Sequence, residues 1–202
     1  MSDHPTKPDA GRAIKRRLPK EARQRQLLDV AWSIVRSEGS DALTLGYLAE
    51  RAGVTKPVVY DHFGARNGLL AALYEEYDSR QHALLDEALE ACAKALPAVA
   101  KVIATSYVDC VMTMGREMPG VSAALTGSPE LEALKKEHEA LFMDKCRHAL
   151  EPFAQKPLKL AAMRAVLGAA EAVSFAALAG EVDPVDAENE ICDAIHRITL
   201  RG

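Results

Sequence analysis

The sequence has few aromatic residues and little Ile and Thr, residues that favour strands. Only 5% of its 202 residues are Phe, Trp or Tyr, whereas Ala, Leu, Glu, Lys and Arg are abundant. This balance excludes a strand-rich fold and predicts an all-α protein. The apolar content of 49% excludes a disordered chain, so the sequence is long and apolar enough to bury a core.

Clustered cysteines are also absent. The four cysteines, Cys92, Cys110, Cys146 and Cys192, lie far apart and form no CxxC pair. A disulfide framework or a zinc module would bring them together in the sequence. We therefore expect reduced thiols in an intracellular protein, with no metal and no cofactor.

Sequence motifs of the common enzymes and of exported proteins are missing. There is no Gly-rich phosphate loop, HExxH, GxSxG or His/Cys cluster, so no catalytic residue is predicted. Residues 1–25 contain no apolar run that could act as a signal peptide. The most apolar segment, Leu160–Gly180, is interrupted by Arg164 and Glu171, which are costly at the centre of a bilayer. We expect a buried helix there, in a cytoplasmic protein that does not enter the membrane.

Charge is distributed unevenly along the chain. Residues 1–66 carry 12 Lys and Arg against 8 Asp and Glu, whereas residues 67–202 carry 13 against 21. A basic N-terminal part favours contact with nucleic acid, although a solvated basic tail would look the same. Residues 1–18 hold two prolines, a glycine and a basic run, and are predicted to be a disordered basic arm. We expect the basic residues from Arg12 to Arg25 to add salt-sensitive DNA affinity that deletion of residues 1–18 would remove.

Three helices are predicted between residues 19 and 66. The second covers residues 44–52, a very short third covers residues 56–63, and the first runs from Pro19 to Gly39 with an inner apolar stripe of Leu27, Leu28, Ala31, Ile34 and Val35. Gly53 suits the left-handed conformation that ends a helix, and Thr44 and Thr55 suit helix N-caps. Val59 and Phe63, four residues apart, are expected to face the same core. Two short helices joined by such a turn describe a helix-turn-helix, in which the second helix enters the major groove of DNA. Two ordinary capped helices with a solvated face remain the alternative at this point.

The segment Leu43–Phe63, LTLGYLAERAGVTKPVVYDHF, closely resembles the DNA-binding motif of TetR-family transcriptional regulators. The resemblance covers residues 20–75 and rests on the Thr-led second helix, the Leu-Ala pair, Ala-Gly-Val-Thr, and the closing Tyr-x-x-Phe. It implies an N-terminal three-helix DNA-binding domain over residues 19–66 and a C-terminal helical ligand-binding and dimerisation domain over residues 67–202. The candidate DNA-binding residues are Thr44, Tyr47, Thr55, Lys56, Pro57, Val58, Tyr60, His62 and Arg66.

Four positions depart from the family pattern. Pro57 stands where Gly is common, which puts an N–H donor there in doubt, and Val59 replaces a commoner Leu. Tyr47 is either an additional phosphate contact or a surface aromatic residue. Asp61 either accepts a hydrogen bond from cytosine or pairs with a basic neighbour.

The remainder of the chain predicts five further helices. They are expected over residues 66–95, 97–117, 128–150, 157–179 and 183–199, with Leu69, Leu73, Leu84, Leu85 and Leu89 on the inner face of the first. A stripe of flexible and aromatic residues is the candidate lining of an apolar pocket, with ordinary core as the alternative. The candidate ligand-binding residues are Tyr107, Cys110, Met114, Met118, Phe142, Met143, Glu171 and Phe175.

Two charged positions in this region need an explanation. His138 lies in a charged stretch and is predicted to be solvated. Glu171, among Ala and Val, needs a partner, which is Arg164, a tyrosine, a ligand or another subunit.

The family resemblance implies a homodimer formed by the last two predicted helices, which are rich in small residues. Their apolar contacts across the dimer are expected from Leu160, Leu167, Val173, Leu178, Ile191, Ile195 and Ile198. A two-fold dimer implies a palindromic double-stranded operator, with the two recognition helices about 34–36 Å apart or a multiple of that distance. It also implies repression that an unidentified small-molecule effector relieves. A transcriptional activator and a helical interaction module remain the alternatives.

Overall fold

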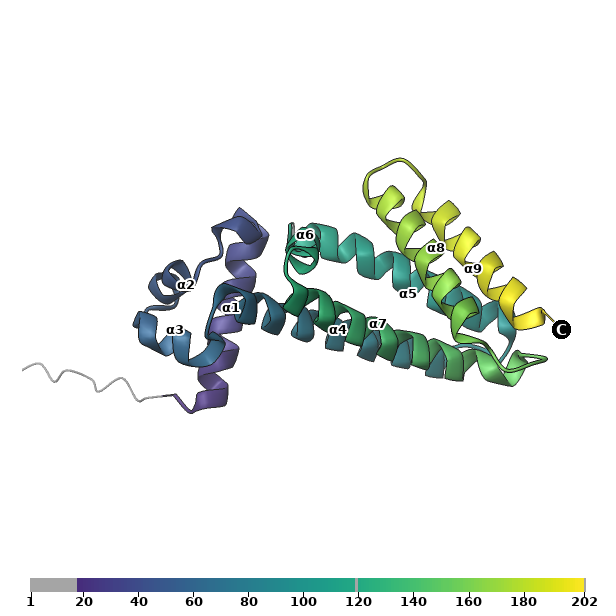
Figure 1. The fold of residues 1–202 in the computed structure, drawn as a ribbon, viewed down its shortest axis with the longest axis horizontal. Helices are drawn as coiled ribbons and strands as arrows, with labels where there is room; N and C mark the ends of the chain where they lie inside the picture. The colour runs from purple at the N-terminus through teal and green to yellow at the C-terminus, as the bar shows by residue number, and fades with distance from the viewer. Residues whose placement is uncertain (1–17, 119, 202) are drawn as a thin grey trace, which may run out of the picture.

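The computed structural model describes residues 18–118 and 120–201, and all regular structure in these residues is helical (Figure 1). The described chain contains nine α-helices, with two short 3-10 turns, η1 and η2, between them. The prediction of an all-α fold is therefore confirmed. The predicted disordered arm lies outside the described residues except for Leu18.

The first three α-helices form the part of the molecule that we call the head. They are α1 (Lys20–Glu38), α2 (Leu45–Ala52) and α3 (Lys56–Phe63), with η1 (Ser40–Ala42) between the first two. Gly39, with φ 81°, ends α1 at the predicted residue. The predicted inner stripe of α1 is buried at Leu27, Ala31, Ile34 and Val35, while Leu28 is half-buried.

The other six α-helices form what we call the body. They are α4 (Arg66–Ala91), α5 (Leu96–Glu117), α6 (Val121–Thr126), α7 (Pro129–Leu150), α8 (Leu160–Leu178) and α9 (Pro184–Leu200), with η2 (Glu151–Phe153) after α7. The short helix α6 was not predicted, because six residues are too few to show a period. The α8 helix begins at Leu160 rather than Pro157, and α4 ends at Ala91 rather than near residue 95. The predicted start of α9 is confirmed, since the Asp183 side chain accepts a hydrogen bond from the backbone N–H of Val185 at 2.8 Å.

The body is a bundle built along α4, which leads out of the head (Figure 1). The α7 helix lies beside α4 and runs in the same direction, because ion pairs join Asp78 to His138 and Asp86 to Lys145 in the same order. The α5 helix returns toward the head, and α8 and α9 pack against it at the far end of the molecule. This arrangement places a cavity between the helices of the body.

Two buried apolar clusters hold the molecule together. The first unites the head with α4 and with four residues from the near end of the body, Met118, Val121, Leu125 and Leu131. The second lies among α5, α7, α8 and α9. Since the first cluster crosses from head to body, a movement of α5, α6 or α7 acts directly on the packing of the head.

Two sets of core predictions are wrong. Leu84, expected on the inner face of α4, is 54% exposed. Leu167, Ile191 and Ile195, expected at the dimer contact, are buried inside the protomer. Periodicity identified these positions as apolar, but a helix with neighbours on several sides has more than one inner face.

Two helices, α5 and α8, are long and apolar enough to cross a membrane by length and composition alone. Both are packed against other helices of the body, and α8 carries Arg164 and Glu171 as predicted. Only 28% of the apolar window of α8 is buried within the protomer. The remainder of α8 presents an outer stripe of small residues, Ala161, Ala165, Gly168, Ala169 and Ala172.

Candidate DNA-binding face and ligand cavity

The turn between α2 and α3 has the geometry of a helix-turn-helix. Gly53 adopts the left-handed conformation, with φ 64° and ψ 36°, and its N–H donates back into α2. Thr44 caps α2 as predicted, because its hydroxyl accepts a hydrogen bond from the Tyr47 N–H at 3.1 Å. Thr55 occupies the N-cap position of α3, but its side chain makes no capping hydrogen bond, contrary to expectation.

The α3 helix is held by its inner side and presents its outer side to solvent. Val59 and Phe63 are buried in the head core as predicted. Tyr60 is 52% exposed, and Lys56 and Pro57 are exposed as well. These three residues, with half-buried Val58 and His62, therefore form a surface that can meet a nucleic acid groove.

Tyr47 belongs to a polar network on the surface of the head. Its hydroxyl donates to the Glu38 carboxylate at 3.1 Å and accepts from Arg51 Nη1 at 2.8 Å. Arg51 is also paired with Glu38 at 3.0 Å, and these contacts raise the pKa of the Arg51 guanidinium, with the Tyr47 hydrogen bond as the main cause. Tyr47 is thus a surface aromatic residue already engaged within the protein.

Arg66 has a structural role that the sequence did not indicate. Its Nε donates to the Leu43 carbonyl at 3.1 Å and its Nη2 to the Ser40 carbonyl at 2.7 Å. The guanidinium therefore ties the start of α4 to the segment between α1 and α2. A contact with phosphate remains a prediction for this residue, and it would compete with these bonds.

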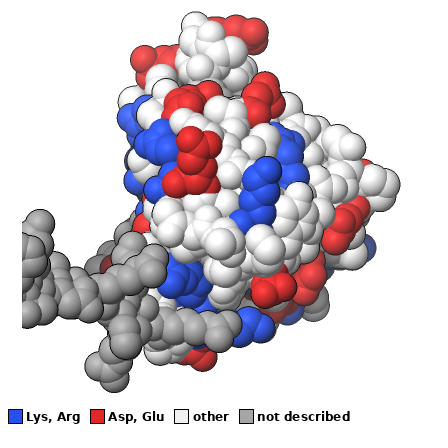
Figure 2. All heavy atoms as spheres, turned by 90° about the vertical axis from the view of Figure 1, so that its left-hand side faces the viewer, with Lys and Arg blue, Asp and Glu red and all other residues white. Residues whose placement is uncertain are grey.

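The face of the head carries charges of both signs. Figure 2 shows Lys and Arg interspersed with Asp and Glu over the part of this face that the structure describes. Beside α3, a shallow hollow is bordered by Lys20 and Arg23 of α1 and by Asp61 and His62. Lys20 and Arg23 were not among the predicted site residues, although both lie in the predicted basic run.

A cavity of about 830 Å³, counting the solvent at its mouth, lies between α4, α5, α7 and α8. We call it the main cavity. Six of the eight predicted ligand-binding residues line it: Tyr107, Cys110, Met114, Phe142, Glu171 and Phe175. Met118 instead lies in the head core cluster, and Met143 lines a separate apolar pocket behind the main cavity. These two residues therefore do not line the main cavity, because one helical stripe passes several different neighbours.

Aromatic side chains form much of the cavity wall. Tyr74 and Tyr77 of α4 were not predicted to lie there, but both do. The Tyr77 hydroxyl donates to the Cys110 carbonyl at 2.5 Å. Burial raises the pKa of Tyr107, so its hydroxyl is a neutral donor. Burial also raises the pKa of the Cys110 thiol to about 11, which leaves it protonated and unreactive at neutral pH.

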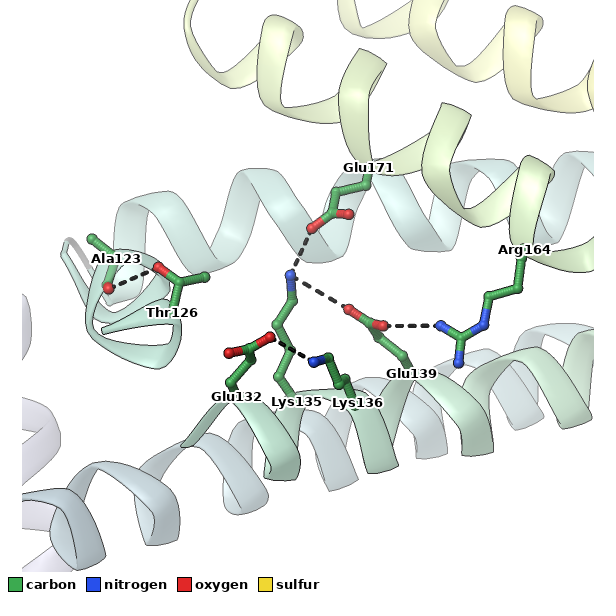
Figure 3. Close-up of polar contacts among 8 residues, drawn as sticks. All are labelled: Ala123, Thr126, Glu132, Lys135, Lys136, Glu139, Arg164 and Glu171. Carbon is green, nitrogen blue, oxygen red and sulfur yellow. Dashed lines mark hydrogen bonds and ion pairs between the residues drawn. The ribbon is translucent and has the colours of Figure 1, made fainter. Parts of the chain in front are cut away.

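Glu171 is paired with Lys135, a partner that was not among the predicted ones. The Lys135 Nζ lies 2.6 Å from Glu171 and 3.4 Å from Glu139, and Arg164 lies 3.4 Å from Glu139 (Figure 3). This network joins α7 to α8 at one side of the main cavity. The hydrogen bond and charge of Glu171 raise the pKa of Lys135 although burial opposes them.

His138 is not solvated, which corrects the sequence-based expectation. Its Nδ1 lies 2.6 Å from Asp78 Oδ2, and its ring packs edge-on against Tyr74. His82 Nε2 lies 3.4 Å from the same carboxylate oxygen. Burial, more than the opposing charge of Asp78, lowers the pKa of His82. No group of His, Cys, Asp and Glu suited to a metal ion occurs in the described residues.

Known proteins include relatives that are similar to this chain in sequence and in fold. Residues 27–73 match the sequence model of the bacterial regulatory proteins of the tetR family. The chain is 35% identical over 71 residues to the HTH-type transcriptional activator FasR of Mycolicibacterium smegmatis, covering 35% of this chain and 32% of FasR. It is 43% identical over 65 residues to the uncharacterized HTH-type transcriptional regulator TtgW of Pseudomonas putida, covering 32% of this chain and 46% of TtgW. The matched segments therefore span less than half the length of these relatives.

The similarity of fold extends much further than the similarity of sequence. SCO4454, a TetR-family transcriptional regulator from Streptomyces coelicolor, superposes with a TM-score of 0.63 over 88% of this chain and 95% of its own, at 18% identity. At that identity the match establishes the fold of the body, while the head carries the matching sequence. Residues 27–73 of this chain are therefore similar in sequence to the tetR family of bacterial regulatory proteins, and the described chain as a whole is similar in fold to a TetR-family transcriptional regulator.

Proposed function

We propose that this protein is a DNA-binding regulator that docks α3 into the major groove. In this proposal residues 1–18 act as a basic arm, residues 19–66 bind DNA, and residues 67–202 bind a ligand and dimerise. The observation that supports it best is the exposed side of α3, where Lys56 and Tyr60 project while Val59 and Phe63 anchor the helix. Lys56 reaches phosphate or base edges, Val58 offers an apolar contact to a thymine methyl, and the N-termini of α2 and α3 favour phosphate.

The regulator acts as a homodimer. The outer stripe of small residues on α8 allows close approach of a second helix, and Leu160, 69% exposed, lies at its end. An isologous contact there repeats α3 about a two-fold axis, which calls for a palindromic operator. Replacing Gly168 by Trp would block this approach, and sedimentation would then detect monomers.

The main cavity binds a small effector that releases the operator. A ligand that binds better to another spacing of the two heads shifts the population away from the DNA-bound form, by no more than its differential affinity. The α4 helix links the two functions, because it lines the cavity and also packs in the head core. In this proposal the cytoplasmic protein represses transcription until the effector binds. Activation is the second candidate, since the relative FasR is named an activator.

Selection of random duplex DNA on the purified full chain tests the proposal. A recovered palindrome is the expected result. Replacing Lys56 and Tyr60 by Ala should then lower affinity and flatten its salt dependence. Lys136→Ala, which removes an exposed lysine of α7, is the matched control and should leave binding unchanged. If no duplex is enriched and the double variant behaves like the control, the chain is a helical interaction module instead.

A further inference from the structure

We propose that the effector is an amphipathic organic cation, an amine or quaternary ammonium ion with a hydrocarbon tail. The inference rests on the proposed function, because it assigns a ligand class to the cavity invoked there. Two independent features carry it: the order in which three adjoining spaces follow one another, and the charge of the wall where the first two meet.

The main cavity meets the surface beside the Lys135–Glu171 ion pair. These two residues, with Met114 and Phe175, line both the main cavity and a shallow hollow on the outside of α5, α6 and α8, which we call the outer hollow. Figure 3 shows Lys135 reaching from α7 toward Glu171 on α8. A ligand entering here passes the ion pair first, so its polar end comes to rest among these charges.

A second space continues the main cavity inward. This apolar pocket is narrow, with only about 20 Å³ of free space, and it has no charged residue in its lining. It shares Tyr107, Phe142 and Leu167 with the main cavity, and the rings of Tyr107 and Phe142 stand 5.4 Å apart between the two. Only apolar groups gain by entering this pocket, so a hydrocarbon tail that passes the two rings would enter it by pushing its apolar walls apart.

The wall of the main cavity carries more negative than positive charge. Three carboxylates, those of Asp78, Glu139 and Glu171, face one lysine, Lys135. Lys135 already forms ion pairs with Glu171 and Glu139. An anionic ligand would have to compete with both carboxylates for this lysine. A cationic ligand gains from the same carboxylates, at the cost of displacing the lysine from Glu171.

The neighbouring groups do not reverse this balance. Arg164, which lies outside the cavity wall, pairs with Glu139 alone. His138 and His82 both contact Asp78, and burial lowers the pKa of His82, which favours its neutral form. The rings of Tyr74, Tyr107, Phe142 and Phe175 supply π faces that attract a cation whose charge is poorly hydrated.

Calorimetry with three probes that share one tail tests the charge preference. The probes are decyltrimethylammonium, decanoate and decanol, used with the full chain below the concentrations at which they form micelles. We expect the cation to bind at least about tenfold more tightly than decanoate, which corresponds to about 1.4 kcal/mol. Glu171→Gln should weaken cation binding by a similar factor. Glu132→Gln is the matched control, because Glu132 forms the same 2.6 Å pair with a lysine, Lys136, on the outside of α7.

Tail length tests the route into the apolar pocket. Affinity should rise from butyltrimethylammonium to decyltrimethylammonium in the unaltered protein. Ala170→Leu, which fills part of the apolar pocket, should remove most of that rise. Ala177→Leu introduces the same side chain at a buried position of α8 that lines neither space, and it should preserve the rise.

The outcomes separate this inference from the proposed function. Tighter binding of decanoate, equal binding of all three probes, or affinity independent of tail length would each overturn the ligand class. Operator binding is measured on the same preparation. If the duplex binds and the cation does not release it, the ligand inference fails alone. If the cation binds and no duplex does, the proposed regulator fails while the ligand class stands.

Discussion

Ser40 of the head lies directly against Gly120 of the body: a Cβ placed on Gly120 would stand only 2.6 Å from the Ser40 Oγ. Ser40 is buried, and its carbonyl accepts the hydrogen bond from Arg66. The contact therefore joins three segments, η1, the start of α4, and the turn before α6. A displacement of the turn before α6 would therefore be transmitted to the head through this contact.

Gly120→Ala should destabilise the protein and weaken the link between head and body. The substitution adds a side chain at φ 81°, which costs about 1–2 kcal/mol, and it also presses on Ser40. Thermal unfolding and operator affinity with and without effector are the measurements. Gly180→Ala is the control, since Gly180 has φ 77° and open space around it. Equal effects of the two substitutions would show that the Ser40 contact is unimportant.

Gly68→Ala should be among the most damaging single substitutions in the head. An added Cβ would lie 2.1 Å from the Phe63 carbonyl oxygen, so α3 and α4 would have to move apart. We expect a loss of about 3 kcal/mol in the free energy of unfolding, the upper end of overpacking costs. Urea unfolding measures it. Gly46→Ala should cost little, because the added Cβ would meet only the flexible end of Lys56, with Cε at 3.5 Å and Nζ at 3.8 Å. A comparable loss there would contradict this account.

Arg66→Ala distinguishes a structural brace from a phosphate contact. If the main role of Arg66 is to donate hydrogen bonds to the Leu43 and Ser40 carbonyls, the substitution leaves these buried acceptors without a charged donor. The free energy of unfolding should then fall by about 1–3 kcal/mol. The slope of operator affinity against salt concentration then stays the same. A slope reduced by about 1, with unchanged stability, would assign the guanidinium to phosphate instead.

The protein should lose stability as the pH falls below the ordinary histidine value because of His82. Burial lowers the pKa of His82 in the folded state, so the unfolded chain binds the proton first as the pH falls through 6.5. The stability that neutral His82 contributes is complete above pH 6.5, the pKa of an unperturbed histidine. It is lost as the pH falls through the lower pKa that His82 has in the folded protein. Urea unfolding at about pH 7.5 and about pH 5 measures the change. His82→Gln should reduce it, whereas His148→Gln, at an exposed imidazole of α7, should not.

Local signals in the sequence were enough to predict the helix-turn-helix. Gly53 in its left-handed turn, the Thr44 cap, and the inward pair Val59 and Phe63 all depend on neighbours within a few residues. These features can be predicted from the local sequence, because a cap, a backbone conformation and a spacing of four residues each depend only on residues within about one helix turn. For the same reason the starts of α1, α2, α3, α7 and α9 were found.

The partners of the body required the tertiary structure. Lys135 and Glu171 are 36 positions apart, and Asp78 and His138 are 60 apart. A helical period states that a residue faces inward, but it does not identify the helix that will face it. The sequence assigned Met118 and Met143 to the ligand pocket and Ile191 and Ile195 to the dimer contact. Their actual neighbours followed only from how α5, α7, α8 and α9 pack together.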